Sequence, residues 1–286
     1  PVIVAPAMNE RMYQNRILQR NISLLQESGV RFVEPECGVL ACGQSGQGRL
    51  ASTDAIIDAV VRALAGGNKL AGMKVLITSG PTREALDAVR FISNPSTGKM
   101  GHALATAARD RGAHVILISG PGTVPDPQGV QVQHVTTAAE MRRAVLEHFD
   151  RCNIVIMAAA VSDFRPIHQV SHKIKKDQAE SVIAVERTED ILLELGKTKS
   201  GQILVGFAAE TENVISEAQR KLEQKNLDMV VANPIGMPGS GFAFDTNEAT
   251  IICRGSEPVE LPRMTKEALA AYIFDKLAEF KVKQGL

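Results

Sequence analysis

The chain has 286 residues, 44% of them hydrophobic, so it can bury a sizeable core as one large domain or as two. Its 32 basic and 32 acidic residues balance, which excludes a protein drawn to nucleic acid or to an anionic membrane by its overall charge. Four cysteines without a CxxC pair, no signal peptide and no apolar run long enough to span a bilayer predict reduced thiols and a cytoplasmic location.

The first 71 residues form a region of their own in the predicted organisation. The chain opens on an apolar strand, PVIVAPAMN, without an initiator methionine, and we expect an N-terminally truncated piece of a longer protein. The predicted elements are a helix at 14–30, a strand at 30–33 and a helix at 54–65 that begins with Asp54 as its N-cap. Between them, residues 36–50 are too rich in glycine for a strand or helix interior and are predicted to form a mobile flap.

From residue 72 to 286, apolar strands alternate with helices. The predicted strands cover 74–78, 114–119, 154–159, 203–208 and 229–232, with an extended stretch at 249–253. The predicted helices cover 100–111, 138–148, 189–195, 213–225 and 266–281. This alternation is typical of a Rossmann-like α/β fold with a mostly parallel sheet and helices on both faces.

A long polar loop follows the first strand of this region and predicts an anion site. Ligands of open parallel sheets bind beyond the carboxyl ends of the strands, where helix N-termini favour phosphate or carboxylate. The loop supplies close backbone approach and positive charge through Gly80, Gly98, Gly101, Arg83, Arg90 and Lys99. Neither the P-loop pattern nor the GxGxxG dinucleotide fingerprint is present, so the loop binds its ligand in another way.

Four further segments carry candidate side chains: two strand ends, a polar connection and a helix. Asp163 follows the run IVIMAAAVSD, where it either accepts a ribose hydroxyl or metal, or caps a helix. Lys173 begins a lysine cluster that either neutralises a triphosphate or is solvated surface. Phe207 either stacks on a ring or belongs to the core. Lys221 and Lys225, four residues apart on one helix, repel each other unless an anion lies between them.

Two residues of the N-terminal region also have alternative interpretations. Asn9 either binds a carboxylate or caps a helix. Cys42 either acts as an acid in the flap or is an inert thiol.

These motifs together resemble a known enzyme family. PAMNERMY at residues 6–13 is similar to the decarboxylase motif PxMNxxMW, with Tyr13 in place of Trp, and ACGQSGQGR at 41–49 is similar to its cysteine flap. SGPTRE, VRFISNPSTGKMG, AAAVSDFRP, KIKK, GFAAET and NLDMVVAN resemble the ligase motifs in their order. The chain thus resembles the bifunctional phosphopantothenoylcysteine decarboxylase/phosphopantothenate–cysteine ligase family of coenzyme A biosynthesis. Residues 1–71 would be the C-terminal part of a flavoprotein-type decarboxylase domain and 72–286 a ligase domain.

The resemblance implies that CTP activates 4′-phosphopantothenate as an acyl-cytidylate, which L-cysteine then converts to an amide. Asn94 would stabilise the acyl-cytidylate, Arg90 would assist the second half-reaction, and Lys173 would contact the cytosine or its phosphates. The CTP site would also include Met157, Ala158, Ala159, Asp163, Glu189, Asp190, Ile191, Leu192, Phe207, Lys221 and Lys225. The family implies Mg²⁺ for this step and a homodimer built through the ligase domain, with a larger homo-oligomer for the full-length protein.

In the decarboxylase half, the resemblance implies FMN, with Asn9 at the substrate carboxylate and Cys42 as proton donor. Because the family's catalytic histidine is missing from this sequence, we expect no decarboxylation by this chain alone. Two other classes stay open: a nicotinamide-binding Rossmann oxidoreductase, which lacks its glycine fingerprint here, and a non-catalytic nucleotide-binding module. The bare sequence does not separate cytosine from adenine.

Overall fold

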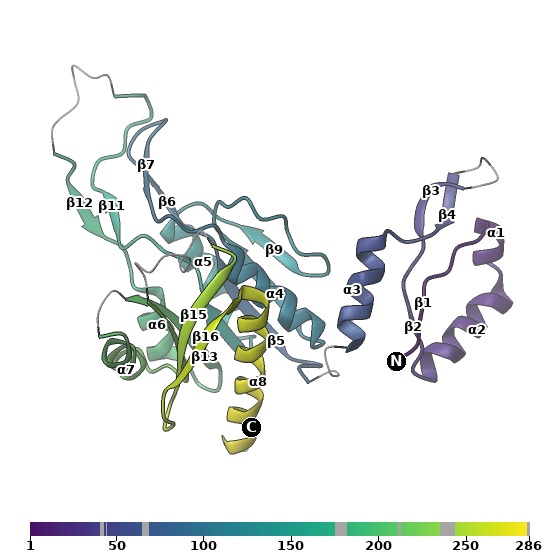
Figure 1. Ribbon diagram of the computed structural model, residues 1–286. Helices are drawn as coiled ribbons and strands as arrows, with labels where there is room; N and C mark the ends of the chain where they lie inside the picture. Colours follow the sequence, from purple (N-terminus) through teal and green to yellow (C-terminus); the bar gives the residue numbers. More distant parts are fainter. Residues whose placement is uncertain are drawn as a thin grey trace. The chain divides into compact units, whose positions relative to one another are not determined.

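The computed structural model describes residues 1–40, 43, 45–64, 69–174, 182–210, 213–234 and 244–284. They form two compact units, Pro1–Lys69 (unit 1) and Leu70–Leu286 (unit 2), each with its own core (Figure 1). No helix in these described ranges is long and apolar enough to cross a membrane.

Unit 1 is small and pairs two short parallel strands with three helices. Its elements are β1 (Ile3–Val4), α1 (Glu10–Tyr13), α2 (Arg16–Glu27), β2 (Arg31–Phe32), β3 (Glu36–Val39), β4 (Ser45–Arg49) and α3 (Thr53–Leu64). Val33, Ala51 and Ala59 form its buried core. Since α3 begins at Thr53, Asp54 lies in the first turn and is not the N-cap, which corrects the prediction.

The glycine-rich segment 36–50 contains strands, so the prediction that it lacks them is wrong. β3 and β4 pair as an antiparallel hairpin. A Cβ on Gly48 would lie 2.1 Å from the Met8 carbonyl oxygen, and one on Gly46 would lie 2.5 Å from the Glu10 carboxylate. These glycines are therefore explained by close packing of the hairpin on the α1 segment.

Unit 2 is built on an eight-stranded sheet in the order β16-β15-β14-β13-β10-β5-β8-β9. The strands are β5 (Lys74–Ser79), β8 (His114–Ser119), β9 (Gln131–His134), β10 (Ile154–Met157), β13 (Ile203–Glu210), β14 (Met229–Pro234), β15 (Thr246–Cys253) and β16 (Val259–Thr265). The six strands from β14 to β9 are parallel, whereas β15 and β16 are antiparallel. This arrangement confirms the predicted mostly parallel α/β sheet.

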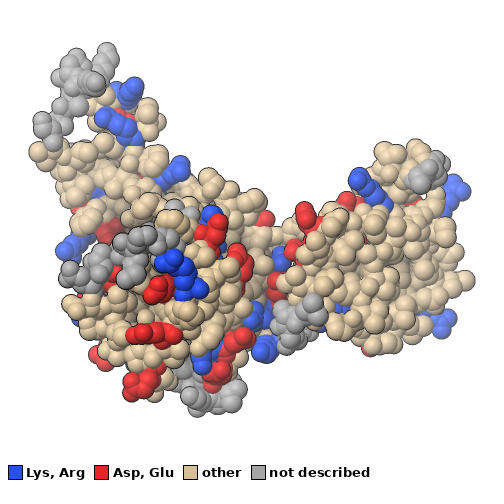
Figure 2. All heavy atoms as spheres, viewed as in Figure 1, with Lys and Arg blue, Asp and Glu red and all other residues tan. Residues whose placement is uncertain are grey.

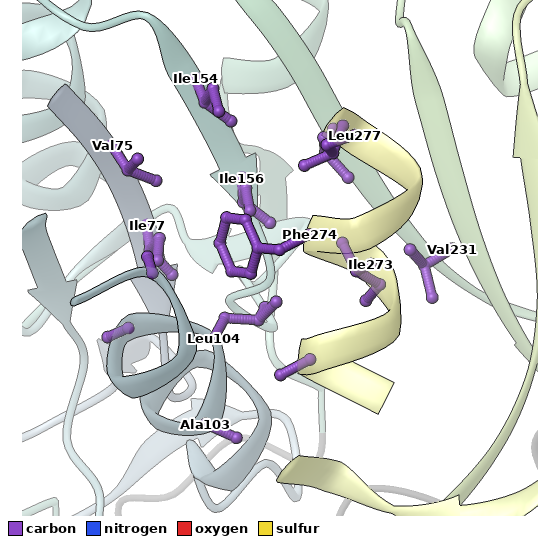
Figure 3. Close-up of a cluster of buried hydrophobic side chains, with 14 of the residues drawn as sticks. Val75, Ile77, Ala103, Leu104, Ile154, Ile156, Val231, Ile273, Phe274 and Leu277 are labelled. Carbon is purple, nitrogen blue, oxygen red and sulfur yellow. The ribbon is translucent and has the colours of Figure 1, made fainter. Parts of the chain in front are cut away.

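Helices cover both faces of the sheet, as predicted. The helices are α4 (Lys99–Asp110), α5 (Ala138–Phe149), α6 (Ile191–Thr198), α7 (Val214–Gln224) and α8 (Lys266–Gln284). α4 and α8 pack on one face, where Phe274 of α8 lies among Ile77, Leu104 and Ile156 (Figure 3). α5, α6 and α7 cover the other face around Leu76. Adjacent residues of one strand thus face opposite cores, which explains the continuous apolar runs.

Several short strands are absent from the sequence prediction. β9 and β16 extend the two edges of the sheet. Two small antiparallel ribbons, β6 (Arg83–Ala85) with β7 (Phe91–Ser93) and β11 (Phe164–Pro166) with β12 (Val185–Arg187), lie side by side next to the sheet (Figure 1). The long loop after β5 is therefore partly a ribbon.

Candidate functional site

A cavity of about 850 Å³ lies at the carboxyl ends of the parallel strands of unit 2. Its lining includes Met157 of β10 with Ala158 and Ala159 just beyond that strand, and Phe207–Ala209 of β13. Residues of four helices and of the loop after β5 complete it. Strand ends and helix N-termini are where ligands of open parallel sheets bind, so the fold places its candidate site at the expected edge. Figure 2 shows acidic and basic side chains interspersed over the viewed face of unit 2, so charge selection depends on the cavity itself.

Most of the predicted site residues line this one cavity. They are Asn94, Met157, Ala158, Ala159, Asp163, Glu189, Asp190, Ile191, Leu192, Phe207, Lys221 and Lys225. They come from segments up to 131 residues apart in sequence, counted from Asn94 to Lys225, and the parallel topology brings them together. Arg90 and Lys173 are not among the lining residues.

The tips of β5 and β10 are tied together below the cavity. Thr78 Oγ1 of β5 accepts a hydrogen bond of 3.1 Å from the backbone N–H of Ala159. The side-chain amide of Asn94 donates to the carbonyl oxygens of Ala160 and Val161, each at 3.1 Å. These two hydrogen bonds fix the orientation of the Asn94 side chain at the strand tip, beside the cavity that it lines.

On the α6–α7 side, the chain supplies its own anion for one lysine of the predicted pair. Lys225 Nζ lies 2.7 and 2.9 Å from the two carboxylate oxygens of Asp190. Asp190 also caps α6 by accepting from the N–H of Leu193 at 3.0 Å. Burial opposes ionisation of Asp190, but the hydrogen bonds from Lys225 and Leu193 outweigh it, and the pKa of this carboxyl is lowered. The helix predicted from residue 189 therefore begins after its cap, at Ile191.

Lys221, the other lysine of the pair, contacts a backbone carbonyl and not a carboxylate. Its Nζ donates to the carbonyl oxygen of Phe207 at 3.0 Å. Burial, and then the charge of Lys225, lower the pKa of Lys221. An anion or acceptor bound next to Lys221 would therefore stabilise its charged form.

Asp163 is not a helix cap, so that interpretation is wrong, and the interpretation as a ligand for a ribose hydroxyl or metal stays a prediction. It stands immediately before strand β11, its side chain lines the cavity, and its carbonyl accepts from the N–H of Thr188 at 3.0 Å. Phe207 is only partly buried and packs against the core while it also lines the cavity.

Arg90, which is not a lining residue, is held by a carboxylate that the sequence analysis did not single out. Its guanidinium donates to Asp87 at 2.6 and 2.9 Å. Asp87 in turn accepts from the backbone N–H of Ile174 at 3.2 Å, which anchors the residue next to the exposed Lys173. Lys175 and Lys176, the remaining lysines of the predicted cluster, lie outside the described residues.

The cavity also has lining residues that the sequence analysis left out of the site. They include Lys266 at the start of α8 and the asparagines Asn233 and Asn247 of β14 and β15, whereas Gly98, Lys99 and Gly101 of the predicted anion loop also line the cavity. Asn247 Nδ2 donates to Asn233 Oδ1 at 3.0 Å. Lys99 was visible as a basic residue of the polar loop, but Lys266 comes 167 residues later in the chain, and only the sheet topology brings the two together.

The two predicted residues of unit 1 have different outcomes. Asn9 is the N-cap of α1, where its side chain accepts from the N–H of Arg11 at 2.9 Å. Cys42 lies outside the described residues. Tyr13, which replaces Trp in the motif, donates its hydroxyl to Glu34 at 2.5 Å, and burial together with this contact raises the pKa of Tyr13 to about 12.

Among the described residues, no group of three or more His, Cys, Asp or Glu side chains is placed to hold a metal ion. A divalent cation at the cavity would therefore depend on ligands from a bound phosphate group.

Two family models match the chain in sequence. The model described as the DNA/pantothenate metabolism flavoprotein C-terminal domain matches residues 70–280, and the flavoprotein model matches residues 1–65.

Individual relatives agree with these matches. A coenzyme A biosynthesis bifunctional protein of Bacillus subtilis strain 168 is 46% identical over the whole chain and 71% of its own length. A cysteine/cysteine sulfinic acid decarboxylase of an unknown prokaryotic organism is 44% identical over 97% of the chain and 79% of its length. The crystal structure of the C-terminal domain of a coenzyme A biosynthesis bifunctional protein is 41% identical with a TM-score of 0.65, covering 76% of this chain and 99% of that one. The chain therefore belongs to the DNA/pantothenate metabolism flavoprotein family, whose bifunctional members act in coenzyme A biosynthesis.

Proposed function

We propose that unit 2 is a CTP-dependent phosphopantothenate–cysteine ligase. A carboxylate oxygen of 4′-phosphopantothenate attacks the α-phosphorus of CTP, and pyrophosphate leaves. The amine of L-cysteine then attacks the acyl carbon of the acyl-cytidylate, and CMP leaves with the carboxylate oxygen. Both steps need charge stabilisation at one place, and the strand-tip cavity gathers the polar and charged groups for it.

The observation that carries this proposal is the single cavity that combines a fixed amide, small strand-tip residues and several lysines. Asn94 is assigned to stabilising the acyl-cytidylate during attack by cysteine, because its amide is held by the two carbonyls beyond β10. Ala158 and Ala159 leave room for a flat ring against the backbone.

The nucleoside is assigned to the α6–α7 side of the cavity. Asp163 would accept a ribose hydroxyl, while Phe207 and the start of α6 would border the base. The base and sugar need hydrogen-bond partners rather than net charge, and the Lys225–Asp190 pair provides both signs in balance.

Arg90 and Lys173 keep their family-derived assignments as proposals, although they lie outside the cavity lining. Arg90 would assist the second half-reaction, and Lys173 would contact the cytosine or its phosphates. The Asp87 carboxylate supports this because it anchors both Arg90 and the neighbour of Lys173, so the two cations belong to one local structure.

Mg²⁺ fits this site only as a companion of the nucleotide. The described residues supply no cluster of carboxylates for it, whereas Mg²⁺ usually keeps several waters and binds substrate phosphates with one or two carboxylates. Asp163 and Glu189 line the cavity and would serve as such ligands in this proposal, for which Glu189 would leave the Arg165 guanidinium that lies 4.0 Å away. The ion would neutralise charge on the phosphates as pyrophosphate leaves.

For unit 1, we assign FMN-dependent decarboxylation of 4′-phosphopantothenoylcysteine to the bifunctional protein as a whole. The described residues do not outline a flavin site: Asn9 is engaged as a helix cap, and Cys42 is outside the described part. We therefore derive no step that involves the flavin.

A homodimer through unit 2 and a cytoplasmic location complete the proposal. The ribbons β6–β7 and β11–β12 support the dimer, because both expose large apolar side chains that a partner could cover. They are Phe91, Phe164 and Val185 in the strands and Ile167 and Ile183 beside them.

The proposal is tested by a pyrophosphate-release assay. With phosphopantothenate present, CTP should release pyrophosphate and ATP should release far less, and cysteine should then trigger amide and CMP formation. Release without phosphopantothenate, or no release with either nucleotide, would refute the ligase assignment. Carbon dioxide released from cysteine instead would favour the activity named for the cysteine decarboxylase relative.

A further inference from the structure

Residues 158–163, called here the strand-tip loop, follow β10 and line the cavity at all but one position. Hydrogen bonds hold this loop against the segment that follows β5. The backbone N–H of Ala160 donates to the Gly80 carbonyl at 2.9 Å, and the backbone N–H of Ser162 donates to Thr82 Oγ1 at 2.9 Å. The position of the strand-tip loop is therefore set by the chain just beyond β5.

Thr82 has the central place in this contact. Its hydroxyl accepts from Ser162, its backbone N–H donates to the Ala160 carbonyl at 3.3 Å, and its own carbonyl accepts from Ser93 Oγ at 2.7 Å. Thr82 is fully buried and is not among the described residues that line the cavity. It belongs to the motif SGPTRE, and the proposed function gives it no role. A buried residue of this kind can act on a ligand only through the groups that it holds.

The groups that Thr82 holds lead to Asn94 by two routes. Ser93, which donates to the Thr82 carbonyl, is the residue before Asn94 in the chain. The Ala160 carbonyl accepts from the Thr82 N–H and also from the Asn94 side-chain amide, which donates in addition to the Val161 carbonyl. A displacement of the strand-tip loop would therefore move both acceptors of the Asn94 amide.

The end of the strand-tip loop at Asp163 has supports of its own. Thr188 Oγ1 donates to the Ser162 carbonyl at 2.6 Å, and the Thr188 N–H donates to the Asp163 carbonyl at 3.0 Å. Ser162 Oγ donates to the Phe164 carbonyl at 2.8 Å. Loss of the Thr82 hydroxyl should therefore shift Ala160 and Val161 more than Asp163.

We propose that Thr82 is a positioning residue for amide formation, because its hydroxyl fixes the strand-tip loop and thereby the Asn94 amide. The proposal rests on the proposed ligase function and extends the site to a residue outside the cavity lining. Without Oγ1, the buried Ser162 N–H has lost its acceptor, and the loop moves to satisfy it. A small shift is enough, since a reacting group is effective only when it is held close to the productive geometry.

The test removes the Thr82 hydroxyl at nearly constant side-chain volume. In Thr82→Val, amide formation should fall about ten-fold or more, whereas pyrophosphate formation and CMP affinity should stay within about three-fold of the unchanged protein. The Ser162 N–H should exchange with deuterium about ten-fold faster or more. Thr82→Ser keeps Oγ1 and should restore each quantity to within about three-fold.

A double-variant cycle tests whether Thr82 acts through Asn94. Adding Thr82→Val to Asn94→Ala should slow amide formation by less than about three-fold more, because the group that Thr82 positions is already gone. Multiplied losses in the double variant would overturn the proposal, as would a Thr82→Ser variant as slow as Thr82→Val. If Thr82→Val fails to fold, Ser93→Ala decides: it should slow amide formation but not pyrophosphate formation, and no change would overturn the proposal.

Thr137→Val is the matched control. It removes another hydroxyl that accepts from a backbone N–H, that of Glu140 at 3.2 Å, and Thr137 is not a described lining residue. This variant should lower Tm without slowing amide formation or changing exchange at Ser162. Unchanged Ser162 exchange in Thr82→Val would overturn the proposal whatever the activity. An unchanged protein that forms no amide would refute the ligase function, while faster exchange in Thr82→Val would leave the hold of Thr82 on the loop standing.

Discussion

The guanidinium of Arg90 and the buried carboxylate of Asp87 form a two-point ion pair with distances of 2.6 and 2.9 Å. The Asp87 side chain is fully shielded, whereas 47% of the Arg90 side chain is exposed. Hydrogen bonds from Arg90, and then from backbone N–H groups including that of Ile174, hold the pKa of Asp87 far below its usual range. One carboxylate therefore connects the ribbon after β5 with the segment that carries Lys173.

Replacing this carboxylate separates the two connected segments. Asp87→Asn should lower Tm by several degrees and reduce the rate of amide formation about ten-fold or more, because Arg90 and Ile174 lose a shared acceptor. CMP binding, which depends on the cavity lining, should change little. Thermal unfolding and a cysteine-dependent amide assay check this. Asp126→Asn, which removes an exposed partner of His134, is the control and should alter neither quantity.

Asn94→Ala separates the two half-reactions. The variant loses the amide held at 3.1 Å by the carbonyls of Ala160 and Val161. Pyrophosphate formation from CTP and phosphopantothenate should stay within about three-fold of the unchanged protein, while amide formation should fall about 100-fold, because the acyl-cytidylate loses a group that orients it. Rapid-quench measurement of both products decides, and a matching loss of both steps would refute the assigned role.

The packing of α4 on β5 has a glycine at its contact point. A Cβ on Gly101 would lie 2.4 Å from the Ser79 Cβ. Gly101→Ala should therefore push α4 away and lower the free energy of unfolding by about 1–3 kcal/mol, with weaker CTP binding. Gly201→Ala, where an added Cβ meets nothing within 4 Å, should stay within about 0.5 kcal/mol. Urea unfolding of both variants gives the comparison, and equal stabilities would contradict the packing.

His102 gives stability a pH dependence of known sign. Burial lowers the pKa of His102, and within the described part of the chain its Nε2 has no hydrogen-bond partner. The unfolded chain thus binds a proton more readily than the folded one. This contribution to stability is present above the unfolded pKa of about 6.5 and is lost as pH falls from there through the lowered folded pKa. His102→Gln should show a shallower loss of unfolding free energy between pH 7.5 and 5.5, and identical slopes would contradict this.

The alternation of apolar runs and helices was enough to predict the central sheet, because strands such as β5 and β10 are buried on both faces and read as continuous apolar segments. Edge strands carry no such signal. β9, QVQH, is polar and short, and β16 contains Pro262, which is tolerated only at an edge. The β3–β4 hairpin was missed because Gly46 and Gly48 are set by a tertiary contact and not by strand propensity.

The sequence predicts site residues that belong to motifs or follow predicted strands. It does not predict those that only the tertiary structure brings to the cavity. Asp163 follows the predicted strand at 154–159 and Asn94 belongs to a family motif, and both line the cavity. Lys266 reads in sequence as an ordinary first residue of a helix, and its burial against the site follows from the antiparallel return of β15 and β16. The ion pair of Lys225 with Asp190 was equally hidden, although both residues were predicted at the site.

Transfer of oxygen-18 tests the central claim most directly. If the carboxylate of phosphopantothenate attacks the α-phosphorus of CTP in this cavity, substrate labelled in both carboxylate oxygens should give CMP that carries one label per turnover and pyrophosphate that carries none. Unlabelled CMP together with labelled pyrophosphate or orthophosphate would contradict the acyl-cytidylate route.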